Sequence, residues 1–533
     1  MTSLTDLPHG ISLLPITTWE NGHENFVHTF KQNASFKLSI PSSQSSNPYF
    51  DTTKNFQWLI QYGIDNNLPL RAMGNGWSFS EVAVCEGGLV DTKALRLTYN
   101  LKNSFVAPEY LQKGNLAANL FFTECGISVL DLDEKLEQDS NPKRSLRASG
   151  ASNGQTIAGC TSTNTHGAGV NVGAVHDSIV GLHIVVGPDR HVWIEKKSNP
   201  VASNDFIKWL GAELIQDDDM FNSAVVSFGS FGFIHGILIE SEPIFLLEQY
   251  RLGNIVYNDA LKKAMNHLDF SDILDVLPYP PVSPDKEMYH FEILVNLQKF
   301  EPNNAQNGVY IKTMYKIPYR DDYTKIKIDD KGFTYGDDLL GVMQTVLDGL
   351  GPGLSSLLVP GLVNKLFPLA FTAGDNMTGT VGETFSNTKF RGKAASAAIG
   401  VHTDSASQVL EEIVAINKEF PFAGALALRY VKGTGALLGF THFDKTCVME
   451  LDGVDSQLSR TFIEKVWNRL DELSIPFTMH WGKFNFSLNP SLLQKMYGNE
   501  KIEKWKNCRK LLLSAEARKV FTNNFMKQCG LDD

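Results

Sequence analysis

The sequence predicts an α+β fold that is divided into more than one domain. At 533 residues, the chain is too long to pack around a single hydrophobic core. Before about residue 245, apolar residues at helical spacing are mixed with short apolar runs that are typical of strands. After that point, segments such as residues 289–295 and 425–431 alternate polar and apolar side chains, as antiparallel strands with two different faces do.

The first half is expected to contain two helices and several strands. Phe56, Leu59 and Ile60 predict an amphipathic helix over residues 55–65, and a second helix is expected over residues 128–137. The turn Gly187-Pro188-Asp189-Arg190 predicts a hairpin between the apolar runs on either side of it. Strands are expected over residues 88–91, 179–186, 191–194 and 237–239.

The second half is expected to hold a further domain and a helical tail. Trp505, Cys508 and Leu512 fall at helical spacing near the C-terminus. Residues 338–371 are rich in leucine but contain three prolines, so no apolar run of about 18 residues could span a membrane. This segment is interpreted as helices packed on the second domain, or as a mobile lid or surface that admits an apolar substrate or touches a membrane.

Composition excludes several classes of protein. Net charge is −11, with no basic stripe, which argues against a nucleic-acid partner. Residues 1–8 do not resemble a signal peptide, so a cytoplasmic location is expected. The six cysteines are scattered without a C-x-x-C pair, which argues against a zinc site or a disulfide framework and favours reduced, buried thiols.

Two glycine-rich segments are the most informative motifs. The first is Arg71-Ala72-Met73-Gly74-Asn75-Gly76-Trp77-Ser78-Phe79-Ser80, and the second runs from Gly150 to Gly169. Glycines at such spacing let backbone N–H groups close on a phosphate-bearing ligand. Together, the segments predict one ligand held from both sides, although ordinary sharp turns remain the alternative.

These segments, with Gln155-Thr156-Ile157-Ala158-Gly159 and Thr165-His166-Gly167, resemble the FAD-binding domain of the vanillyl-alcohol oxidase superfamily. Within it, the chain resembles the branch of alditol oxidases, aldonolactone oxidases and type II cholesterol oxidases. Later motifs agree: Thr441-His442, His480-Trp481-Gly482-Lys483 and Val520-Phe521-Thr522-Asn523.

The resemblance implies a particular domain arrangement. Residues 1–245 and 471–533 would form a two-part, PCMH-type FAD-binding domain, and residues 246–470 an inserted α+β substrate domain built on an antiparallel sheet. The chain has no G-x-G-x-x-G fingerprint between a strand and a helix, which argues against a nicotinamide cofactor.

The resemblance also implies FAD as cofactor. Many relatives carry a flavin-bonded histidine where this chain has Trp77, or Asn75 in another alignment. Neither side chain can make that bond, so we expect non-covalent FAD, and Cys160 is interpreted as a packing residue. Predicted cofactor-binding residues are Gly74, Asn75, Gly76, Trp77, Ser78, Gly150, Gly154, Gln155, Thr156, Gly159, Ser162, Thr165, His166, Gly167, Val180 and Lys483.

Catalytic candidates follow from the same resemblance. Lys483 matches a family lysine beside the flavin, and Arg429 matches the arginine of a Glu-x-Arg pair that would polarise the substrate oxygen. A surface lysine and a structural ion pair are the alternatives. Ala427 stands where the paired glutamate is expected, so the catalytic base is open. The candidate bases are His442, His480, Glu292 and Glu450, each of which could instead be an ordinary core or surface residue.

The sequence therefore favours an FAD-dependent oxidase that takes a hydride from an alcohol carbon to flavin N5 and passes electrons to molecular oxygen. A dehydrogenase with another acceptor is one alternative, and a flavin-binding protein without catalysis is another. The substrate is expected to be a sugar, polyol, lactone or sterol-like alcohol, because the apolar segment favours a sterol and the glycine segments favour a polyol or sugar.

Overall fold

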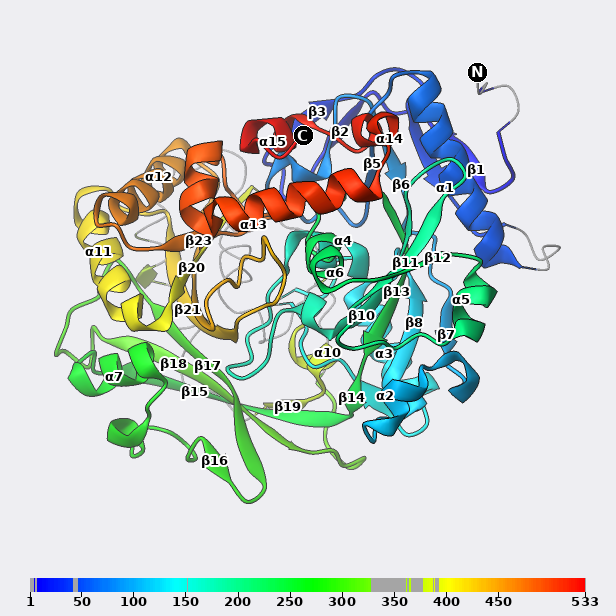
Figure 1. Cartoon of the computed structure of the whole chain (residues 1–533). Coiled ribbons are helices and arrows are strands. Elements are labelled where there is room, and N and C mark those ends of the chain that lie inside the picture. Colours follow the sequence, from blue (N-terminus) through cyan, green and yellow to red (C-terminus); the bar gives the residue numbers. More distant parts are fainter. Residues whose placement is uncertain are drawn as a thin grey trace.

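The computed structural model describes residues 7–41, 47–150, 152–326, 377–386 and 393–532, together with Leu4, Gly361, Asn364, Lys365 and Thr388. The predicted apolar segment at residues 338–371 therefore lies almost entirely outside the described residues. Over the described ranges, no helix is both long and apolar enough to cross a membrane. The architecture is mixed α+β, as the sequence predicts, and its large sheets lie in different parts of the molecule (Figure 1).

Two sheets come from the first half of the chain. A four-stranded sheet has the order β1 (Ile11–Leu14), β4 (Ser35–Leu38), β6 (Gly88–Asp91) and β5 (Leu70–Met73). A six-stranded sheet has the order β12 (Glu213–Gln216), β11 (His191–Glu195), β10 (Ile179–Val185), β13 (Phe233–Glu240), β8 (Leu120–Glu124) and β7 (Thr98–Asn100). The predicted hairpin is confirmed, because β10 and β11 pair antiparallel on either side of the expected turn.

The second half builds a nine-stranded sheet. Its order is β19 (Met377–Gly379), β15 (Phe245–Ile255), β18 (Val309–Pro318), β17 (Lys286–Val295), β21 (Gly424–Lys432), β22 (Lys445–Val454), β20 (Ala394–His402) and β23 (Phe477–Met479), and β16 (Val282–Ser283) pairs with β17. All these pairs are antiparallel, as the alternating segments predict. Two short ladders join β2 (Thr18–Glu20) to β3 (Val27–Thr29) and β9 (Arg144–Ser145) to β14 (Glu242–Pro243).

Helices cover these sheets (Figure 1). In the view of Figure 1, α11 and α12 lie beside the nine-stranded sheet, and α13 crosses the upper part of the molecule below α14 and α15. The helices of the described residues are α1 (Pro48–Asp65), α2 (Pro108–Gln112), α3 (Val129–Asp139), α4 (Ile157–Thr163), α5 (Asn204–Leu210), α6 (Asp218–Ala224), α7 (Asp259–His267), α10 (Val381–Thr384), α11 (Ala406–Glu419), α12 (Gln457–Glu472), α13 (Pro490–Leu512), α14 (Ala515–Val520) and α15 (Asn524–Cys529).

The first helix begins seven residues before the expected position. Asn47 caps α1 by accepting a hydrogen bond from the backbone N–H of Phe50, and Pro48 occupies the first turn. Both features favour the start of a helix at this position, independently of the spacing of the apolar residues that follow. The apolar spacing therefore located the buried face of α1, and the cap fixed its beginning.

The C-terminal helices return to the first half of the chain. The Trp505 side chain of α13 donates a hydrogen bond to the carbonyl of Val226 at 3.3 Å, and Asn523 donates one to the carbonyl of Val84 at 2.7 Å. The domain boundaries at residues 245 and 470 stay a prediction.

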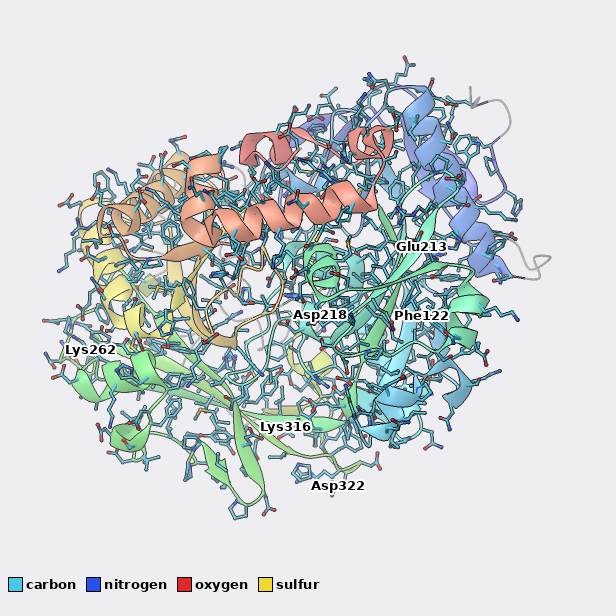
Figure 2. All side chains as sticks on the ribbon, in the orientation of Figure 1. Phe122, Glu213, Asp218, Lys262, Lys316 and Asp322 are labelled. Atoms are coloured by element: carbon cyan, nitrogen blue, oxygen red, sulfur yellow. The ribbon has the colours of Figure 1, made fainter. Side chains whose placement is uncertain are left out.

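Side chains fill the space between these elements (Figure 2). Phe122 of β8 is fully buried in a cluster with Trp193 and Phe206, whereas Lys262 lies toward the periphery of the molecule (Figure 2). All six cysteines are buried and free, as the sequence predicts.

Candidate active site

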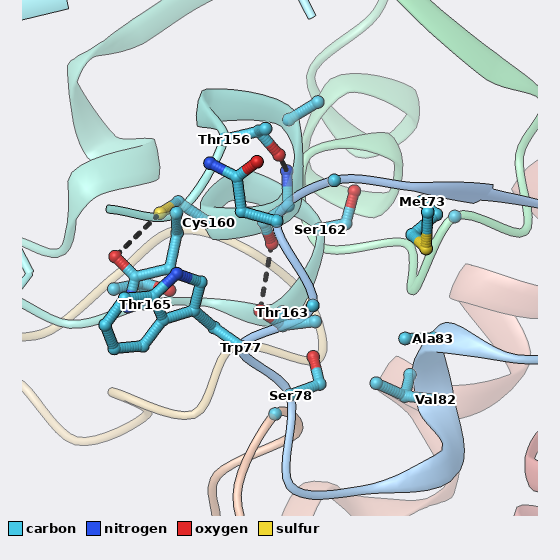
Figure 3. Close-up of a pocket in the computed structure, with 18 of the residues that line it drawn as sticks. Met73, Trp77, Ser78, Val82, Ala83, Thr156, Cys160, Ser162, Thr163 and Thr165 are labelled. Carbon is cyan, nitrogen blue, oxygen red and sulfur yellow. Dashed lines mark hydrogen bonds between the residues drawn. The ribbon is translucent and has the colours of Figure 1, made fainter. Parts of the chain in front are cut away.

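One cavity is lined by both glycine segments. It has a volume of about 1400 Å³, including the part open to solvent. Figure 3 shows Trp77 and Ser78 from the first segment on one side, and Thr156, Cys160 and Thr165 from the second segment nearby. The structure therefore brings the two segments to a single site.

The two glycine segments contact each other directly. Asn75 donates a hydrogen bond from Nδ2 to the carbonyl of Gly154 at 2.5 Å. A Cβ atom at Gly74 would lie 2.2 Å from Thr156 Oγ1, and a Cβ atom at Gly154 would lie 2.8 Å from Trp77 Cζ2. Glycine is required at both positions because the neighbouring segment occupies the space of a side chain.

Hydrogen bonds fix the motif His480-Trp481-Gly482-Lys483 to the first glycine segment. The backbone N–H of Phe79 donates to the carbonyl of Gly482 at 2.8 Å, and Ser80 Oγ donates to the carbonyl of Trp481 at 2.6 Å. These bonds hold Lys483 at the cavity wall, where its side chain is 16% exposed. A residue near the C-terminus thus reaches a site built mainly from residues 71–166.

Behind the cavity, buried charges of alternating sign connect adjacent strands of the nine-stranded sheet. Lys312 Nζ lies 2.6 Å from Glu292 Oε2, and Arg429 Nε donates to Glu292 Oε1 at 2.8 Å. Arg429 Nη1 lies 2.9 Å from Glu450 Oε2, and Lys483 pairs with Glu450 Oε1. The series therefore runs from Lys312 through Glu292, Arg429 and Glu450 to Lys483, and its last two members line the cavity.

Strand register explains this series. Glu292 of β17 lies opposite Lys312 of β18 on one side and opposite Arg429 of β21 on the other. Ala427, two residues from Arg429 on the same face of β21, lies opposite Glu450 of β22. The carboxylate expected at position 427 is thus supplied from the neighbouring strand, and Arg429 has two carboxylate partners.

The charges in the series stabilise one another. Burial by itself raises the pKa of Glu450, but Arg429 and Lys483 outweigh it and hold this pKa well below its ordinary value. The same balance, with Arg429 and Lys312, holds the pKa of Glu292 well below its ordinary value. Burial lowers the pKa of Lys483, but Glu450 and Asp452 more than compensate, so the net shift is upward. Near neutral pH, the glutamates are therefore carboxylates and the lysine is a cation.

The predicted histidines lie in different places. His166 lines the cavity, contacts the carbonyl of Gly167 through Nδ1 at 2.9 Å, and has Nε2 3.5 Å from Glu450 Oε1. His480 also lines the cavity, but its Nδ1 accepts the backbone N–H of Gly482 at 3.0 Å. Burial, with smaller effects of His166 and Lys483, holds the pKa of His480 well below its ordinary value, so the ring is neutral.

His442 lies apart from the cavity lining. Its ring packs on Phe443 and Tyr497, with ring centroids 5.5 and 5.4 Å away. Burial and the charge of Lys501 lower its pKa to about 4. His442 follows a turn beside α13. The structure therefore does not bring it together with the other predicted catalytic residues.

Most predicted cofactor-binding residues lie on the cavity wall. Those that line it are Gly74, Asn75, Gly76, Trp77, Ser78, Gln155, Thr156, Gly159, Ser162, Thr165, His166 and Lys483. Those outside the lining are Gly150, Gly154, Gly167 and Val180. A side chain at Gly150 would meet Thr165, and one at Gly154 would meet Trp77. These two glycines therefore let the residues of the cavity wall pack closely from behind. Val180 packs against the cluster around Phe122.

The structure adds residues to the cavity wall that sequence reasoning missed. Arg71 opens the first glycine segment, Phe228 and Gly229 come from the loop after α6, and Asp452 follows Glu450 on β22. Arg71 carried a signal, since it is a charged residue in a short strand whose apolar residues Leu70 and Met73 are buried. Across the described part of the chain, no group of three or more histidine, cysteine or acidic residues could hold a metal ion.

Sequence comparison finds similarity to enzymes that act on aldonolactones. No family model matches the chain. The chain is 24% identical to L-gulono-1,4-lactone dehydrogenase of Mycobacterium tuberculosis over 34% of each chain. It is 24% identical to D-arabinono-1,4-lactone oxidase of Kluyveromyces lactis over 35% of this chain and 30% of that protein. The chain thus matches about a third of the length of these curated relatives.

Structural comparison covers nearly the whole chain. Cholesterol oxidase from B. sterolicum superposes with a TM-score of 0.67 at 13% identity, covering 99% of this chain and 100% of that one. A solvent-stable cholesterol oxidase gives 0.61 at 14% identity, with coverage of 99% and 100%. The protein therefore has the fold of these cholesterol oxidases. Together with the aldonolactone relatives, this confirms the resemblance to the vanillyl-alcohol oxidase superfamily.

Proposed function

We propose that the protein is an FAD-dependent oxidoreductase that oxidises the alcohol carbon of a sugar-lactone or sterol-like substrate. The observation that carries the proposal is the single cavity lined by both glycine segments, with Lys483 and Glu450 on its wall. The names of the relatives, aldonolactone oxidases and dehydrogenases on one side and cholesterol oxidases on the other, support this class of chemistry.

The residues present fit a flavin dinucleotide. Both glycine segments line the cavity, and its wall carries two cations, Lys483 and Arg71, of which Arg71 has no hydrogen-bond partner among the described residues. Gly74 to Ser78 and Gln155 to Thr165 would hold the cofactor. When bound, FAD would supply the hydride acceptor for the substrate carbon. Trp77 and Asn75 cannot form a histidyl bond to it, so non-covalent binding remains part of the proposal.

Lys483 supplies positive charge to the cavity. Its ammonium group is fixed by Glu450 and its net pKa shift is upward, so it stays protonated near neutral pH. A fixed cation stabilises negative charge that develops on a bound group during reaction. Arg429 supports this arrangement from behind, because it holds Glu450 in place without itself lining the cavity.

His166 is the favoured acceptor of the substrate hydroxyl proton. Because the carbonyl of Gly167 accepts a hydrogen bond from Nδ1–H, the neutral ring has its lone pair on Nε2. Glu450, whose Oε1 is 3.5 Å from this nitrogen, would stabilise the imidazolium that forms. His480 is less suited, because Gly482 already uses its Nδ1 lone pair and the backbone of Asn164 hydrogen-bonds the ring.

An anaerobic reduction screen tests the proposal. Protein loaded with FAD is mixed without oxygen with sugars, aldonolactones and sterols, and the flavin absorbance is followed. The proposal predicts bleaching by at least one substrate class. Rapid recovery of colour after air is admitted identifies an oxidase, and slow recovery identifies a dehydrogenase. A bound flavin that no substrate bleaches would contradict the activity.

The role of His166 is tested in the same assay. His166→Gln should retain bound FAD but slow bleaching by about 10²- to 10⁴-fold, as expected for loss of a general base. Because the rate should then lose its dependence on one ionisation, the pH profile of bleaching is recorded too. His442→Gln, outside the cavity lining, serves as the control and should bleach like the unmodified protein.

A further inference from the structure

Arg71 is a buried cation on the cavity wall without a hydrogen-bond partner among the residues that the structure describes. It lies on β5 and is 2% exposed. Its Nε, Nη1 and Nη2 atoms are all buried and make no hydrogen bond with any residue that the structure describes. A buried guanidinium is normally paired, because losing its hydration without a partner is costly. Its three unsatisfied nitrogens therefore indicate a missing partner.

A second buried arginine, Arg509, adds to the positive charge around Arg71. Arg509 of α13 is also buried, and its guanidinium is held by the backbone carbonyls of Ser230, Asp532 and Arg518. Burial, with a smaller effect of Arg71, lowers the pKa of Arg509 to about 9. Burial lowers the pKa of Arg71 to about 10, against the opposing effects of Cys85 and Glu86. Both arginines are therefore cations near neutral pH.

The backbone opposite Arg71 approaches its guanidinium closely. Gly229 has φ +69°, and a Cβ atom there would lie 3.3 Å from Arg71 Nη1. Phe228 has φ +56°, which is uncommon for a non-glycine residue. Both residues also line the cavity. Backbone in sparsely populated conformations beside an unsatisfied charge is typical of a ligand-binding position.

We propose that Arg71 is the counter-charge for the diphosphate of the bound flavin dinucleotide, an inference that rests on the proposed function. The diphosphate is the anionic part of oxidised FAD, whereas the isoalloxazine, ribityl and adenosine parts are neutral. A guanidinium donates hydrogen bonds to two phosphate oxygens in a fixed geometry. The glycine segments supply backbone donors, and Arg71 supplies the full positive charge that they lack.

Flavin binding by the protein freed of flavin tests this role without any measurement of activity. FAD and riboflavin, which lacks phosphate, are titrated into the unmodified protein and into Arg71→Met and Arg71→Lys. Arg71→Met should weaken FAD binding by about 10- to 100-fold, the range for loss of a hydrogen bond between charged groups. Riboflavin binding should be unchanged in this variant. The FAD affinity of Arg71→Lys should lie between those of the unmodified protein and Arg71→Met.

Thermal unfolding of the flavin-free protein gives a second readout. Since Arg71→Met removes a buried charge without a partner, this variant should unfold at the same or a higher temperature than the unmodified protein, while its FAD complex unfolds at a lower one. Arg144→Met is the matched control. Arg144 is buried, donates to Ser241 Oγ at 3.2 Å and lies outside the cavity lining, so its loss should leave the ratio of FAD to riboflavin affinity unchanged.

Two results would overturn the assignment of Arg71. One is an Arg71→Met variant that binds FAD as tightly as the unmodified protein. The other is an equal loss of FAD and riboflavin affinity, which would indicate a distorted cavity. Failure of the unmodified protein to bind FAD is a different result, because it would overturn the proposed function itself.

Discussion

Ala427 lies directly opposite Glu450 across the β21–β22 pair, and Glu450 makes the ion pair with Arg429 that the sequence led us to expect from position 427. The site therefore keeps its carboxylate–arginine pair but assembles it across two strands. A small residue at 427 is needed because a second carboxylate there would face Glu450.

Ala427→Glu should destabilise the protein. The introduced carboxylate would lie beside the Glu450 carboxylate in a buried place, so one of the two would take a raised pKa. Relative to Ala427→Gln, which has the same size without the charge, we expect a loss of at least about 1 kcal/mol of unfolding free energy near neutral pH. Urea unfolding measures this difference.

The pH dependence of that difference checks its cause. A carboxyl whose pKa is raised in the folded state binds its proton more tightly there, so the destabilisation is relieved as pH falls through that raised pKa. The Glu and Gln variants should therefore converge in acid. A gap between them that stays constant with pH would show that packing, and not charge, is responsible.

Glu450→Gln should leave Lys483 and part of Arg429 without a full counter-charge. Removing one member of a buried ion pair typically costs about 3–5 kcal/mol, and Glu292 still partners Arg429, so we expect about 3 kcal/mol. Glu213→Gln is the control. Glu213 pairs with Arg190 at 2.8 Å on the surface, where loss of a salt bridge typically costs less than about 1 kcal/mol. Equal losses in the two variants, measured by urea unfolding, would refute the buried series as a stabilising feature.

Buried neutral histidines should make the protein sensitive to mild acid. Burial, assisted by Lys483, lowers the pKa of His23 from 6.5 to about 3. Below pH 6.5 the unfolded chain binds a proton that the folded state does not accept, so stability present above pH 6.5 is lost as pH falls toward 3. The other buried histidines with a lowered pKa are His176, His183, His235, His290 and His480.

Replacing one such histidine should flatten this dependence. Between about pH 7 and about pH 5.5, His23→Gln should lose about 1 kcal/mol less unfolding free energy than the unmodified protein. His442→Gln should behave alike, because the pKa of His442 is lowered to about 4. Urea titrations at both pH values measure the difference. Curves for both variants that run parallel to that of the unmodified protein would exclude this linkage.

Gly74→Ala should impair flavin binding. The new Cβ atom would lie 2.2 Å from Thr156 Oγ1, so the two glycine segments would be forced apart. Overpacking typically costs about 1–3 kcal/mol, which predicts a loss of FAD affinity of about 5- to 150-fold. Adding Thr156→Ala to this variant should restore part of the affinity, because it removes the clashing atom.

Gly187→Ala is the control for the glycine experiment. Its Cβ atom would lie 3.6 Å from the nearest neighbouring atom, in the turn between β10 and β11. Fluorescence titration with FAD measures binding in each variant. A Gly74→Ala variant that binds FAD as well as Gly187→Ala would show that the contact between the two segments does not shape the site.

Local patterns in the sequence predicted much of the fold and one side of the site. The glycine segments are short-range motifs, and the alternating residues of 289–295 and 425–431 do form antiparallel strands, in β17 and β21. Their polar residues, however, do not face solvent. His290, Glu292 and Arg429 are buried, because they satisfy one another and Lys312 across neighbouring strands.

The rest of the site depends on pairing between distant parts of the chain. That Glu450 replaces a carboxylate at position 427 follows from the register of β21 against β22, which no local pattern in the sequence specifies. The local sequence identifies Arg71 only as a strand residue. That its guanidinium lacks a hydrogen-bond partner among the described residues depends on the folded wall of the cavity. His442 belongs to the motif Thr441-His442, but the chain places this residue beside α13, away from the cavity lining.

The most direct test of non-covalent flavin binding is a titration of FAD into purified protein freed of flavin, followed by precipitation in acid. We expect a single bound equivalent, with flavin fluorescence and absorbance changed on binding, and release of all the flavin into the supernatant after acid. A protein that takes up no FAD would contradict the assignment of the cavity, and flavin retained in the acid pellet would contradict the non-covalent binding inferred from Trp77 and Asn75.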